Sequence, residues 1–352
     1  MSRIFVAMSG GVDSSLAAAM LADRGEDVVG VWMRLTPAGF DSDAPRCCGT
    51  SEAGDQARQA ASHLGIPFYA LDYAELFGRE VVDRFVRSYA SAETPNPCVA
   101  CNQYVKFEAL LRDVIGKFGA DRLATGHYAR VAERGGRRRL LRACDTSKDQ
   151  SYALYTLGQH ELDRLELPIG ELTGKAETRA LAAAYGLPNA DAIESMDICF
   201  ISGDYRGFVR DRAPDAFVPG PVRREDGVQV GTHAGIGTLT IGQRSGVGVA
   251  AGERLYVLRL DPVRNEAVVG RRDEIRVRAY ALRELRWTGP APVAEVRTTA
   301  ALRYRGSVVG CIVRPAASEL ILDEPALVAP GQAAVFYDGD EVIGGGVIDR
   351  AA

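Results

Sequence analysis

The stretch "RIFVAMSGGVDSSLAAAMLADRG", residues 3–25, decides the fold class of this chain. It begins with a short apolar run typical of a buried strand. The segment "SSLAAAMLADRG" has the composition of a helix, and Gly25 can take the left-handed conformation that often follows a helix. The loop "SGGVDSS" joins the two. A glycine-rich loop between a strand and a helix is typical of α/β proteins that bind an anion at the helix N-terminus.

Strand and helix compositions continue to alternate up to about residue 205. The strand-like segments are "DVVGVWMRL", "IPFYALD" and "DRLATGHYARV", the last of which we expect to run into a loop. The helical segments are "EAGDQARQAASHLG", which ends at Gly65, "AELFGREVVDRFVRSYA", "KFEALLRDVIGKFG", residues 159–167 and residues 175–185. Apolar strands alternating with helices predict a Rossmann-like α/β domain with a parallel sheet covered on both faces.

The pattern changes after about residue 203. Glycines crowd "VGTHAGIGTLTIGQRSGVGVAAG", and the short alternating segments "RLYVLRL" and "EAVVGRR" indicate strands. From Trp287 onward, segments such as "GQAAVFYDGDEVIGGGVID" predict a small antiparallel barrel or sandwich. We therefore expect three domains: a catalytic domain at residues 1–205, a central module at 206–275 and a β-barrel-like domain at 276–352.

Composition limits the class of protein. The chain has 352 residues, a formal net charge of −4 and 7 cysteines. The apolar run at residues 4–8 is too short for a signal peptide or a membrane span, so we expect a cytoplasmic protein. Unevenly spaced cysteines, odd in number, do not suggest a secreted disulfide framework. The net charge gives no support to a generic nucleic-acid coat, although clusters such as "RRRLLR" could form a local basic surface.

The loop at residues 9–15 predicts its own ligand. Gly10 and Gly11 permit positive φ and close approach to a phosphate, and three serines add hydroxyl donors. The carboxylate of Asp13 would repel a phosphate unless Mg²⁺ bridged the two. The loop matches neither the Walker nor the dinucleotide pattern. It resembles the pyrophosphatase loop of ATP-dependent adenylating enzymes, and a plain glycine turn with a serine cap is the structural alternative.

Cysteines offer the nucleophile that adenylation would require, because an adenylated oxygen becomes a leaving group. "TPNPCVACNQYVKF", residues 94–107, carries Cys98 and Cys101, which we expect in a proline-fixed loop before a helix at residues 106–118. "MDICFI" carries Cys199. A redox couple, a metal site and a nucleophile with a helper all fit such cysteines.

A structural zinc site is a further alternative for these cysteines, but zinc usually takes four protein ligands and no fourth is evident. Cys47 and Cys48 are adjacent, which is awkward geometry for a shared ion. We expect Cys144 and Cys311 to be ordinary half-buried thiols.

Motifs along the whole chain resemble those of the tRNA-specific 2-thiouridylase family. They occur in the family's order as "SGGVDSS", "TPNPCVACNQYVKF", "ATGHYAR", "KDQSYALYTL", "ICFI", "TIGQRSGVG" and "PGQAAVFY". Members replace O2 of the wobble uridine with sulfur in tRNAs for Lys, Glu and Gln. The resemblance implies a pyrophosphatase-loop domain that uses ATP and Mg²⁺. The implied partners are tRNA and a sulfur donor, such as a cysteine desulfurase or a relay protein.

The resemblance also implies roles for individual residues. Those that would bind ATP are Ala7, Met8, Ser9, Gly10, Gly11, Val12, Asp13, Ser14, Met33 and Gly126. Cys101 and Cys199 would be catalytic together with Asp13, with Cys199 carrying the sulfur. Those that would contact tRNA or its target base are Asn96, Pro97, Cys98, His127, Lys148, Asp149, Gln150, Arg303, Tyr304 and Gln332. From residues alone we expect His127 to be a packed loop histidine, and Asp149 could cap a helix.

Two sulfur mechanisms stay open. In one, Cys199 carries a persulfide and Cys101 resolves it by forming a disulfide. In the other, Cys98, Cys101 and Cys199 hold a 4Fe–4S cluster with one iron open to hydrosulfide. Cys98 stands where some family members carry aspartate, which favours the cluster, because a thiol exchange needs only two cysteines.

Two other classes of function remain as alternatives. Another adenylating ligase of the same loop class would need no cysteine pair. A non-catalytic RNA-binding protein would not need an intact loop, so Gly10, Gly11, Asp13 and Ser14 argue against it.

Overall fold

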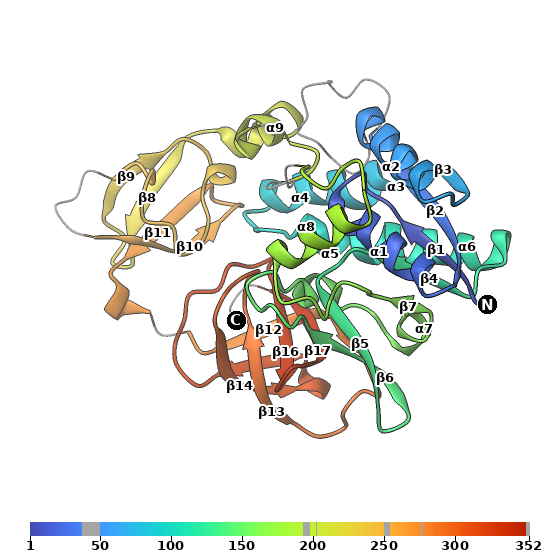
Figure 1. Ribbon diagram of the computed structural model, residues 1–352. Coiled ribbons are helices and arrows are strands. Elements are labelled where there is room, and N and C mark those ends of the chain that lie inside the picture. Colours follow the sequence, from blue (N-terminus) through green and yellow to red (C-terminus); the bar gives the residue numbers. More distant parts are fainter. Residues whose placement is uncertain (37–49, 193–197, 202, 250–253, 276, 350–352) are drawn as a thin grey trace.

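The computed structural model describes residues 1–352 except for 37–49, 193–197, 202, 250–253, 276 and 350–352. The described strands form a five-stranded, a four-stranded and an eight-stranded sheet (Figure 1). None of the described helices has the length and apolar character needed to cross a membrane.

The N-terminal sheet is parallel, with the strand order β3-β2-β1-β4-β7. Its strands are β1 (Arg3–Ala7), β2 (Asp27–Arg34), β3 (Phe68–Asp72), β4 (Arg122–Thr125) and β7 (Leu165–Glu166). Alternate residues of β1 enter opposite cores: Phe5 packs in one apolar cluster, and Ile4 and Val6 pack in another. The expected parallel sheet with both faces covered is confirmed.

Helices cover this sheet on both sides. They are α1 (Val12–Asp23), α2 (Ser51–His63), α3 (Ala74–Phe77), α4 (Asp83–Ala90), α5 (Pro97–Ala100), α6 (Leu111–Phe118), α7 (Gln159–Leu162) and α8 (Lys175–Ala184). The π-helical segment η1 (Gly78–Val82) joins α3 to α4, and η2 (Cys101–Leu110) joins α5 to α6. Gly25 and Gly65 follow α1 and α2 with φ of 80° and 66°, as predicted.

The expectation of a loop around Cys98 and Cys101 is wrong. The helix begins at Pro97 rather than at residue 106 and continues through η2 and α6. Asn96 caps it, because its Oδ1 accepts hydrogen bonds from the backbone N–H of Cys98 at 3.0 Å and of Val99 at 3.4 Å. Proline suits the first helical position, where no N–H is needed. Asn96 and Pro97 therefore start a helix that carries both cysteines.

The helix expected at residues 159–167 is also wrong in its second half. α7 ends at Leu162, and Leu165 and Glu166 form β7 at the edge of the parallel sheet. Leu123 and Ala124 of β4 pair with these two residues. Pairing with a strand distant in sequence overrides the local helical pattern here.

A β-hairpin connects the N-terminal domain to the C-terminal one. β5 (Ala129–Arg134) and β6 (Arg137–Arg142) are joined by Gly135 and Gly136, whose φ values of 60° and 71° suit a tight hairpin turn. β6 then pairs with the C-terminal sheet through Leu141 and Glu341. A strand continuing into a loop was predicted for this segment, and the hairpin was not.

The two remaining sheets belong to the central and C-terminal parts. The central part contains α9 (Tyr205–Arg212) and the strands β8 (Gly220–Arg224), β9 (Gln229–His233), β10 (Tyr256–Asp261) and β11 (Glu266–Gly270). The C-terminal strands are β12 (Ala279–Trp287), β13 (Val296–Ala301), β14 (Val308–Arg314), β15 (Glu319–Leu322), β16 (Ala333–Asp338) and β17 (Glu341–Ile348). β12 pairs with both β15 and β17, which closes these six antiparallel strands into the expected barrel.

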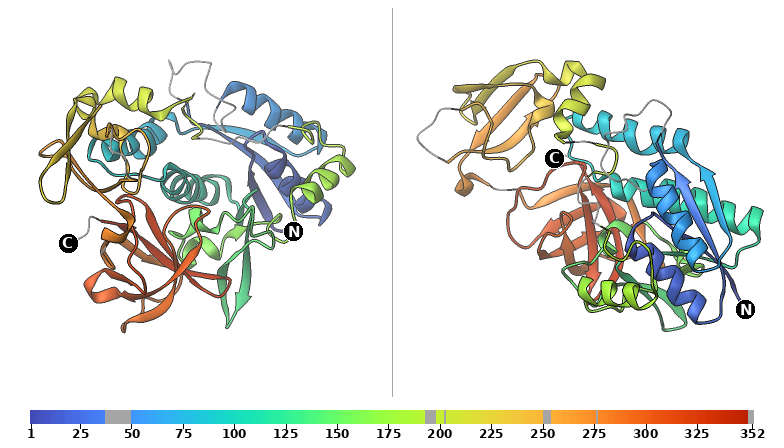
Figure 2. Two further views of the ribbon diagram at one scale, coloured as in Figure 1. Left: turned by 90° about the vertical axis from the view of Figure 1, so that its left-hand side faces the viewer. Right: turned by 45° about the horizontal axis from the view of Figure 1, so that its top comes forward.

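The cysteine-bearing helix lies at the centre of the molecule. In the left view of Figure 2 it runs between the N-terminal sheet, the barrel and the central part. Apolar residues of the N-terminal domain, such as Tyr152 and Tyr155, share one core with Val335 and Val342 of the barrel. The two domains are therefore packed through a common core.

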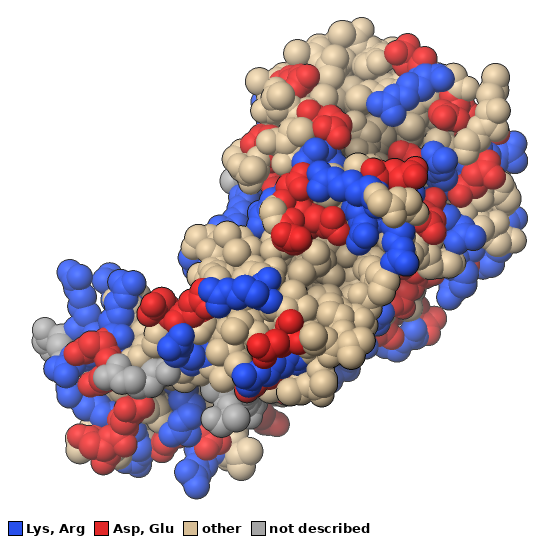
Figure 3. Space-filling model, turned by 90° about the horizontal axis from the view of Figure 1, so that it is seen from below, with Lys and Arg blue, Asp and Glu red and all other residues tan. Residues whose placement is uncertain are grey.

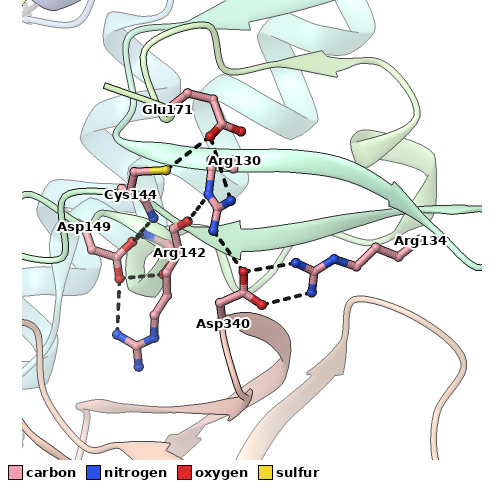
Figure 4. Close-up of polar contacts among 9 residues, drawn as sticks. Arg130, Arg134, Arg142, Cys144, Asp149, Glu171 and Asp340 are labelled. Carbon is pink, nitrogen blue, oxygen red and sulfur yellow. Dashed lines mark hydrogen bonds and ion pairs between the residues drawn. The ribbon is translucent and has the colours of Figure 1, made fainter. Parts of the chain in front are cut away.

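Arginines of the hairpin hold the barrel by ion pairs (Figure 4). Asp340 accepts hydrogen bonds from Arg130 Nη2 at 2.9 Å and from Arg134 Nη1 at 2.9 Å. Arg139 bonds to Glu341 at 3.1 Å, and the guanidinium of Arg142 lies 3.6 Å from the centroid of the Tyr337 ring. The cluster "RRRLLR" thus contributes contacts within the protein as well as positive charge.

We predict that Asp340→Asn weakens this junction. Removing the charge leaves the guanidinium groups of Arg130 and Arg134 without their carboxylate, and partial exposure limits the cost to about 1 kcal/mol. The free energy of unfolding from urea denaturation measures the effect. Asp338→Asn is the matched control, because the Asp338 side chain in the same turn is exposed. Equal losses in both variants would contradict this account of the junction.

Candidate nucleotide and sulfur-transfer site

The loop between β1 and α1 has the geometry of an anion-binding site. Gly10 has a φ of 85°, and a Cβ there would lie 2.4 Å from the carbonyl oxygen of Ala53. Among the described residues, no side chain caps α1 at Gly11. The N–H groups of the first turn of a helix have no intrahelical partners and carry partial positive charge. This loop can therefore bind phosphate through its backbone.

Serine side chains fix the shape of the loop. Ser14 Oγ accepts a hydrogen bond from the backbone N–H of Ser9 at 3.0 Å and donates to the carbonyl oxygen of Gly11 at 3.1 Å. Ser15 Oγ donates to the same carbonyl at 3.2 Å. These hydroxyls hold the loop in one conformation before any ligand arrives.

The predicted nucleotide residues converge at one edge of the sheet. β2 and β4 flank β1, and Met33 and Gly126 stand at or just beyond their carboxyl ends, beside the loop. A Cβ on Gly126 would lie 2.5 Å from the backbone nitrogen of Ser14, so only glycine lets the chain pass so close to α1. Ligands of open parallel sheets bind at this edge.

Asp13 is held by residues that no pattern in the sequence predicts. Its Oδ1 accepts hydrogen bonds from Lys175 Nζ at 2.7 Å and from the Tyr128 hydroxyl at 3.0 Å. The Tyr128 hydroxyl also lies 2.7 Å from Thr178 Oγ1. No described residue donates a hydrogen bond to Asp13 Oδ2, so this oxygen can serve as a ligand for a hard cation such as Mg²⁺.

Asn189, which was also not predicted, stabilises the loop through two hydrogen bonds. Its Nδ2 donates to the carbonyl oxygen of Gly10 at 2.8 Å and to Ser15 Oγ at 2.9 Å. The side chain is buried, and its Oδ1 has no hydrogen-bond partner among the described residues. Asn189 precedes the segment that leads to Cys199, so it connects the loop to that part of the chain.

The three predicted sulfur-site cysteines differ in exposure. Cys98 is exposed, Cys101 is buried and Cys199 is half-buried. Cys101 belongs to an apolar cluster that also includes Phe77 and Phe200, and Cys199 packs against this same cluster. Within the described part of the chain, no three His, Cys, Asp or Glu side chains are grouped so that they could hold a metal ion.

The remaining cysteines differ from expectation. Cys144 is exposed rather than half-buried, and its thiol donates to Glu171 Oε2 at 3.2 Å, a bond that raises the pKa of the thiol (Figure 4). Cys311 is fully buried, and burial raises its pKa to about 12. Cys47 and Cys48, considered for a zinc site, lie outside the described residues.

The segment before the cysteine-bearing helix is docked on the other two domains. The carbonyl oxygen of Thr94 accepts a hydrogen bond from Gln332 Nε2 at 2.7 Å, and its N–H donates to the carbonyl oxygen of Pro330 at 2.7 Å. The Thr94 hydroxyl lies 3.4 Å from that of Thr240 in the central part. The predicted tRNA-contacting residue Gln332 therefore positions the chain just ahead of Asn96.

His127 stands between the nucleotide loop and the cysteine-bearing helix. Its Nδ1 lies 2.6 Å from Thr125 Oγ1, and its ring centroid lies 6.2 Å from that of Phe107. Burial, with a smaller contribution from the charge of Lys106, holds the pKa of His127 well below its ordinary value. The imidazole is therefore neutral at physiological pH.

The predicted tRNA residues at 148–150 make structural contacts. Asp149 Oδ1 accepts hydrogen bonds from the backbone N–H of Ala143 at 3.0 Å and of Ser151 at 3.1 Å. Gln150 Oε1 accepts from the N–H of Tyr128 at 2.9 Å. Their contact with tRNA stays a prediction.

The loop at residues 303–305 lies beside this segment. Tyr304 is 37% exposed, and its ring centroid lies 6.0 Å from that of Tyr152. The guanidinium of Arg305 lies 5.2 Å from the centroid of the Tyr304 ring. Tyr304 of the barrel is thus a neighbour of Tyr152, which follows Gln150 by two residues. On the face seen from below in Figure 3, positive and negative side chains are interspersed across the described residues.

A cavity of about 250 Å³ lies between η2, the segment at residues 156–161 and β12. None of the predicted site residues lines it. The candidate site is therefore the open edge of the parallel sheet and not this cavity.

Comparisons with known proteins cover nearly the whole chain. Three family models match: "tRNA methyl transferase HUP domain" at residues 2–203, "tRNA methyl transferase PRC-barrel domain" at 206–271 and "Aminomethyltransferase beta-barrel domain" at 277–348. A protein of Roseiflexus castenholzii named "tRNA-specific 2-thiouridylase MnmA" is 46% identical, over 99% of this chain and 100% of the relative. Proteins of the same name from Chloroflexus aurantiacus and Moorella thermoacetica are each 45% identical, over 99% of both chains.

We predict that Gly126→Ala lowers the affinity for ATP at least about tenfold, because the new methyl group displaces the start of α1. Isothermal titration calorimetry with Mg²⁺ and ATP measures the change. Gly116→Ala is the control: this glycine is exposed in α6 and a Cβ there meets nothing within 4 Å. The control should keep its ATP affinity and gain about 0.5–1 kcal/mol of stability. Unchanged binding in Gly126→Ala would contradict the close approach.

We predict that, at acidic pH, the free energy of unfolding of His127→Gln falls less steeply with decreasing pH than that of the wild type. The folded protein keeps His127 neutral, whereas the unfolded chain takes up a proton below a pH of about 6.5. Falling pH therefore favours unfolding, by up to about 1.4 kcal/mol per pH unit in the window below that value. Urea unfolding at a series of pH values from 7.5 downward tests this. An identical slope in wild type and His127→Gln would show that the histidine does not contribute.

Proposed function

This chain belongs to the tRNA-specific 2-thiouridylase family, and from that premise we propose that it replaces O2 of the wobble uridine with sulfur in tRNAs for Lys, Glu and Gln. The reaction consumes ATP and releases AMP and pyrophosphate. The observation that carries the proposal is the uncapped start of α1, with Gly126 fitted against it, in one domain with the helix that bears Cys101.

ATP makes the uridine oxygen a leaving group. The carbonyl O2 attacks the α-phosphorus, pyrophosphate departs, and the oxygen becomes part of an AMP ester. The backbone of residues 9–14 and the first turn of α1 bind and orient the phosphates. Asp13 Oδ2 is suited to hold Mg²⁺, which would neutralise phosphate charge when bound.

The cysteines deliver sulfur in successive steps. A donor first leaves a persulfide on Cys199, and its terminal sulfur attacks C2 of the adenylated uridine and expels AMP. The thiolate of Cys101 then attacks Cys199 Sγ, which breaks the persulfide bond, leaves sulfur on C2 and forms a Cys101–Cys199 disulfide. A thiol reductant restores both cysteines. The donor is a cysteine desulfurase or a relay protein.

We prefer this route to a 4Fe–4S cluster on Cys98, Cys101 and Cys199. Cys101 and Cys199 contact a common apolar cluster, whereas Cys98 is exposed on the first turn of the helix. The described residues contain no grouping of three such ligands, so they do not fit the cluster. Cys98 would then contact the target base together with Asn96 and Pro97.

The RNA surface combines residues of the first and the third of three proposed domains, which we divide at residues 205 and 275. His127, Lys148, Asp149 and Gln150 come from the first domain. Arg303, Tyr304 and Gln332 come from the barrel. An exposed tyrosine beside an arginine can stack on an unpaired base and contact its phosphate. The wobble nucleotide is already unpaired, so extruding it costs little. We place the reaction in the cytoplasm.

Other functions make different demands. Another adenylating ligase would need ATP but not Cys101 or Cys199. A non-catalytic RNA-binding protein would need neither ATP nor the cysteines. The words "methyl transferase" describe two of the matching family models, and methyl transfer would not require cleavage of ATP to AMP. Release of pyrophosphate that depends on tRNA therefore distinguishes the proposed function from RNA binding alone and from methyl transfer.

We predict that Cys101→Ser and Cys199→Ser each lose thiolation at least about a hundredfold, because each removes a nucleophile from the sulfur steps. Both should retain pyrophosphate release, which precedes sulfur transfer. Anaerobic assays with ATP, unmodified tRNA and a persulfide donor, followed by mass spectrometry of nucleosides, measure the product. Cys144→Ser, at an exposed thiol, is the control and should match wild type.

Iron analysis of the anaerobically purified protein completes this experiment. We expect no stoichiometric iron or acid-labile sulfide in the wild type, and substantial activity in Cys98→Ser. A cluster lost together with activity in Cys98→Ser would refute the persulfide route. Thiolation without either Cys101 or Cys199 would refute the assignment of the cysteines.

A further inference from the structure

Lys175 occupies a position that is electrostatically unfavourable without a nearby anion. It is the first residue of α8, where the helix dipole disfavours a cation, and its side chain is only 14% exposed. Glu177, the acidic residue of the same turn, is directed to Thr173. Its Oε2 accepts hydrogen bonds from the backbone N–H of Thr173 at 2.6 Å and from the Thr173 hydroxyl at 2.8 Å. The ammonium group of Lys175 instead lies 2.7 Å from Asp13 Oδ1 in the nucleotide loop.

A chain of hydroxyl groups fixes Asp13 next to this lysine. The Tyr128 hydroxyl donates to Asp13 Oδ1 and also lies 2.7 Å from Thr178 Oγ1, which is itself 3.3 Å from the carbonyl oxygen of Gly174. Gln150 accepts from the N–H of Tyr128 through its side chain and donates its own N–H to the carbonyl oxygen of Tyr128. The tyrosine is therefore fixed from both ends, whereas Lys175 reaches Asp13 on a flexible four-carbon stem.

We propose that Lys175 is a catalytic residue that exchanges partners: it pairs with Asp13 before nucleotide binds and then binds the β- and γ-phosphates of ATP. This inference rests on the proposed function, because it concerns the nucleotide of the adenylation step. A triphosphate offers more negative charge than one carboxylate. A cation arriving on Asp13 Oδ2 also weakens the hold of Oδ1 on the ammonium group by repulsion.

The exchange gives Lys175 a role in bond cleavage. O2 of the uridine forms a bond to the α-phosphorus, and the bond from that phosphorus to the α–β bridging oxygen breaks. The electron pair leaves on pyrophosphate, and the N3 proton of the uridine passes to water. The ammonium group of Lys175 stabilises the charge that develops on the leaving group. Tyr128 and Thr178 act through Asp13 as positioning residues.

The test compares ATP and AMP binding in Lys175→Met and in the control Arg179→Met. Arg179 lies one turn further along α8 and is exposed, so the control loses a cation from the same helix but not from the site. We expect Lys175→Met to bind ATP with Mg²⁺ at least about tenfold more weakly, with AMP affinity nearly unchanged. At saturating ATP, tRNA-dependent pyrophosphate release should fall by about a hundredfold. Lys175→Arg should restore part of both losses.

Each other outcome overturns the proposal. Equal weakening of ATP and AMP in Lys175→Met would show that the lysine only maintains the shape of the loop, and unchanged ATP binding would show that it does not reach the phosphates. Lys175→Gln replaces the methionine variant if that one does not fold. A wild type that binds ATP but releases no pyrophosphate with tRNA would refute the proposed function, while the ATP and AMP comparison would still decide the role of Lys175.

Discussion

The backbone of Thr94 is the fixed point on which the rest of the site depends. Its carbonyl and N–H groups are both bonded to the barrel, and its hydroxyl lies against Thr240 of the central part. Two residues further on, Asn96 caps the helix that carries Cys98 and Cys101. A displacement of the barrel or of the central part would therefore move the start of the helix and with it the cysteines. The cysteine geometry depends on how all three parts are assembled.

A second constraint positions the nucleotide loop. Gly126 brings β4 against the start of α1, and Asn189 holds the Gly10 carbonyl from a segment much later in the chain. The loop is thus shaped before it meets a ligand, which lowers the entropy cost of binding. His127 directly follows Gly126 and contacts Phe107 of the cysteine-bearing helix. The nucleotide loop and the cysteine-bearing helix are therefore connected through Gly126 and His127, which directly follow β4.

Features encoded by neighbouring residues were readable from the sequence. The strand, glycine loop and helix at residues 3–25 predicted the parallel sheet, and the glycines after α1 and α2 marked the helix ends. The start at Pro97 was missed because "PNP" was interpreted as a loop, although asparagine followed by proline also fits a cap and first helical position. β7 was missed because two residues carry no periodic pattern of their own.

The contacts of Asp13 could not be predicted from the sequence, because the contacting residues are far apart along the chain. Lys175 is 162 residues from Asp13, and Asn189 is 179 residues from Gly10. Such pairs follow from how α8 packs on α1, which depends on the completed sheet. Charge repulsion between a carboxylate and phosphate indicates that Asp13 needs a cation, but it does not distinguish a metal ion from a lysine of a distant helix. The exposure of Cys144 was likewise missed, since it depends on where the hairpin ends.

The β5–β6 hairpin limits how this protein can be divided into fragments. A fragment ending near the close of the first domain would retain β6 and lose β17, its partner strand in the barrel. It would also uncover the rings of Tyr152 and Tyr155, which are buried against barrel residues. A bare strand edge next to newly exposed aromatic surface is a template for association between chains. Truncated forms would therefore be prone to aggregate, and the two domains need each other for solubility.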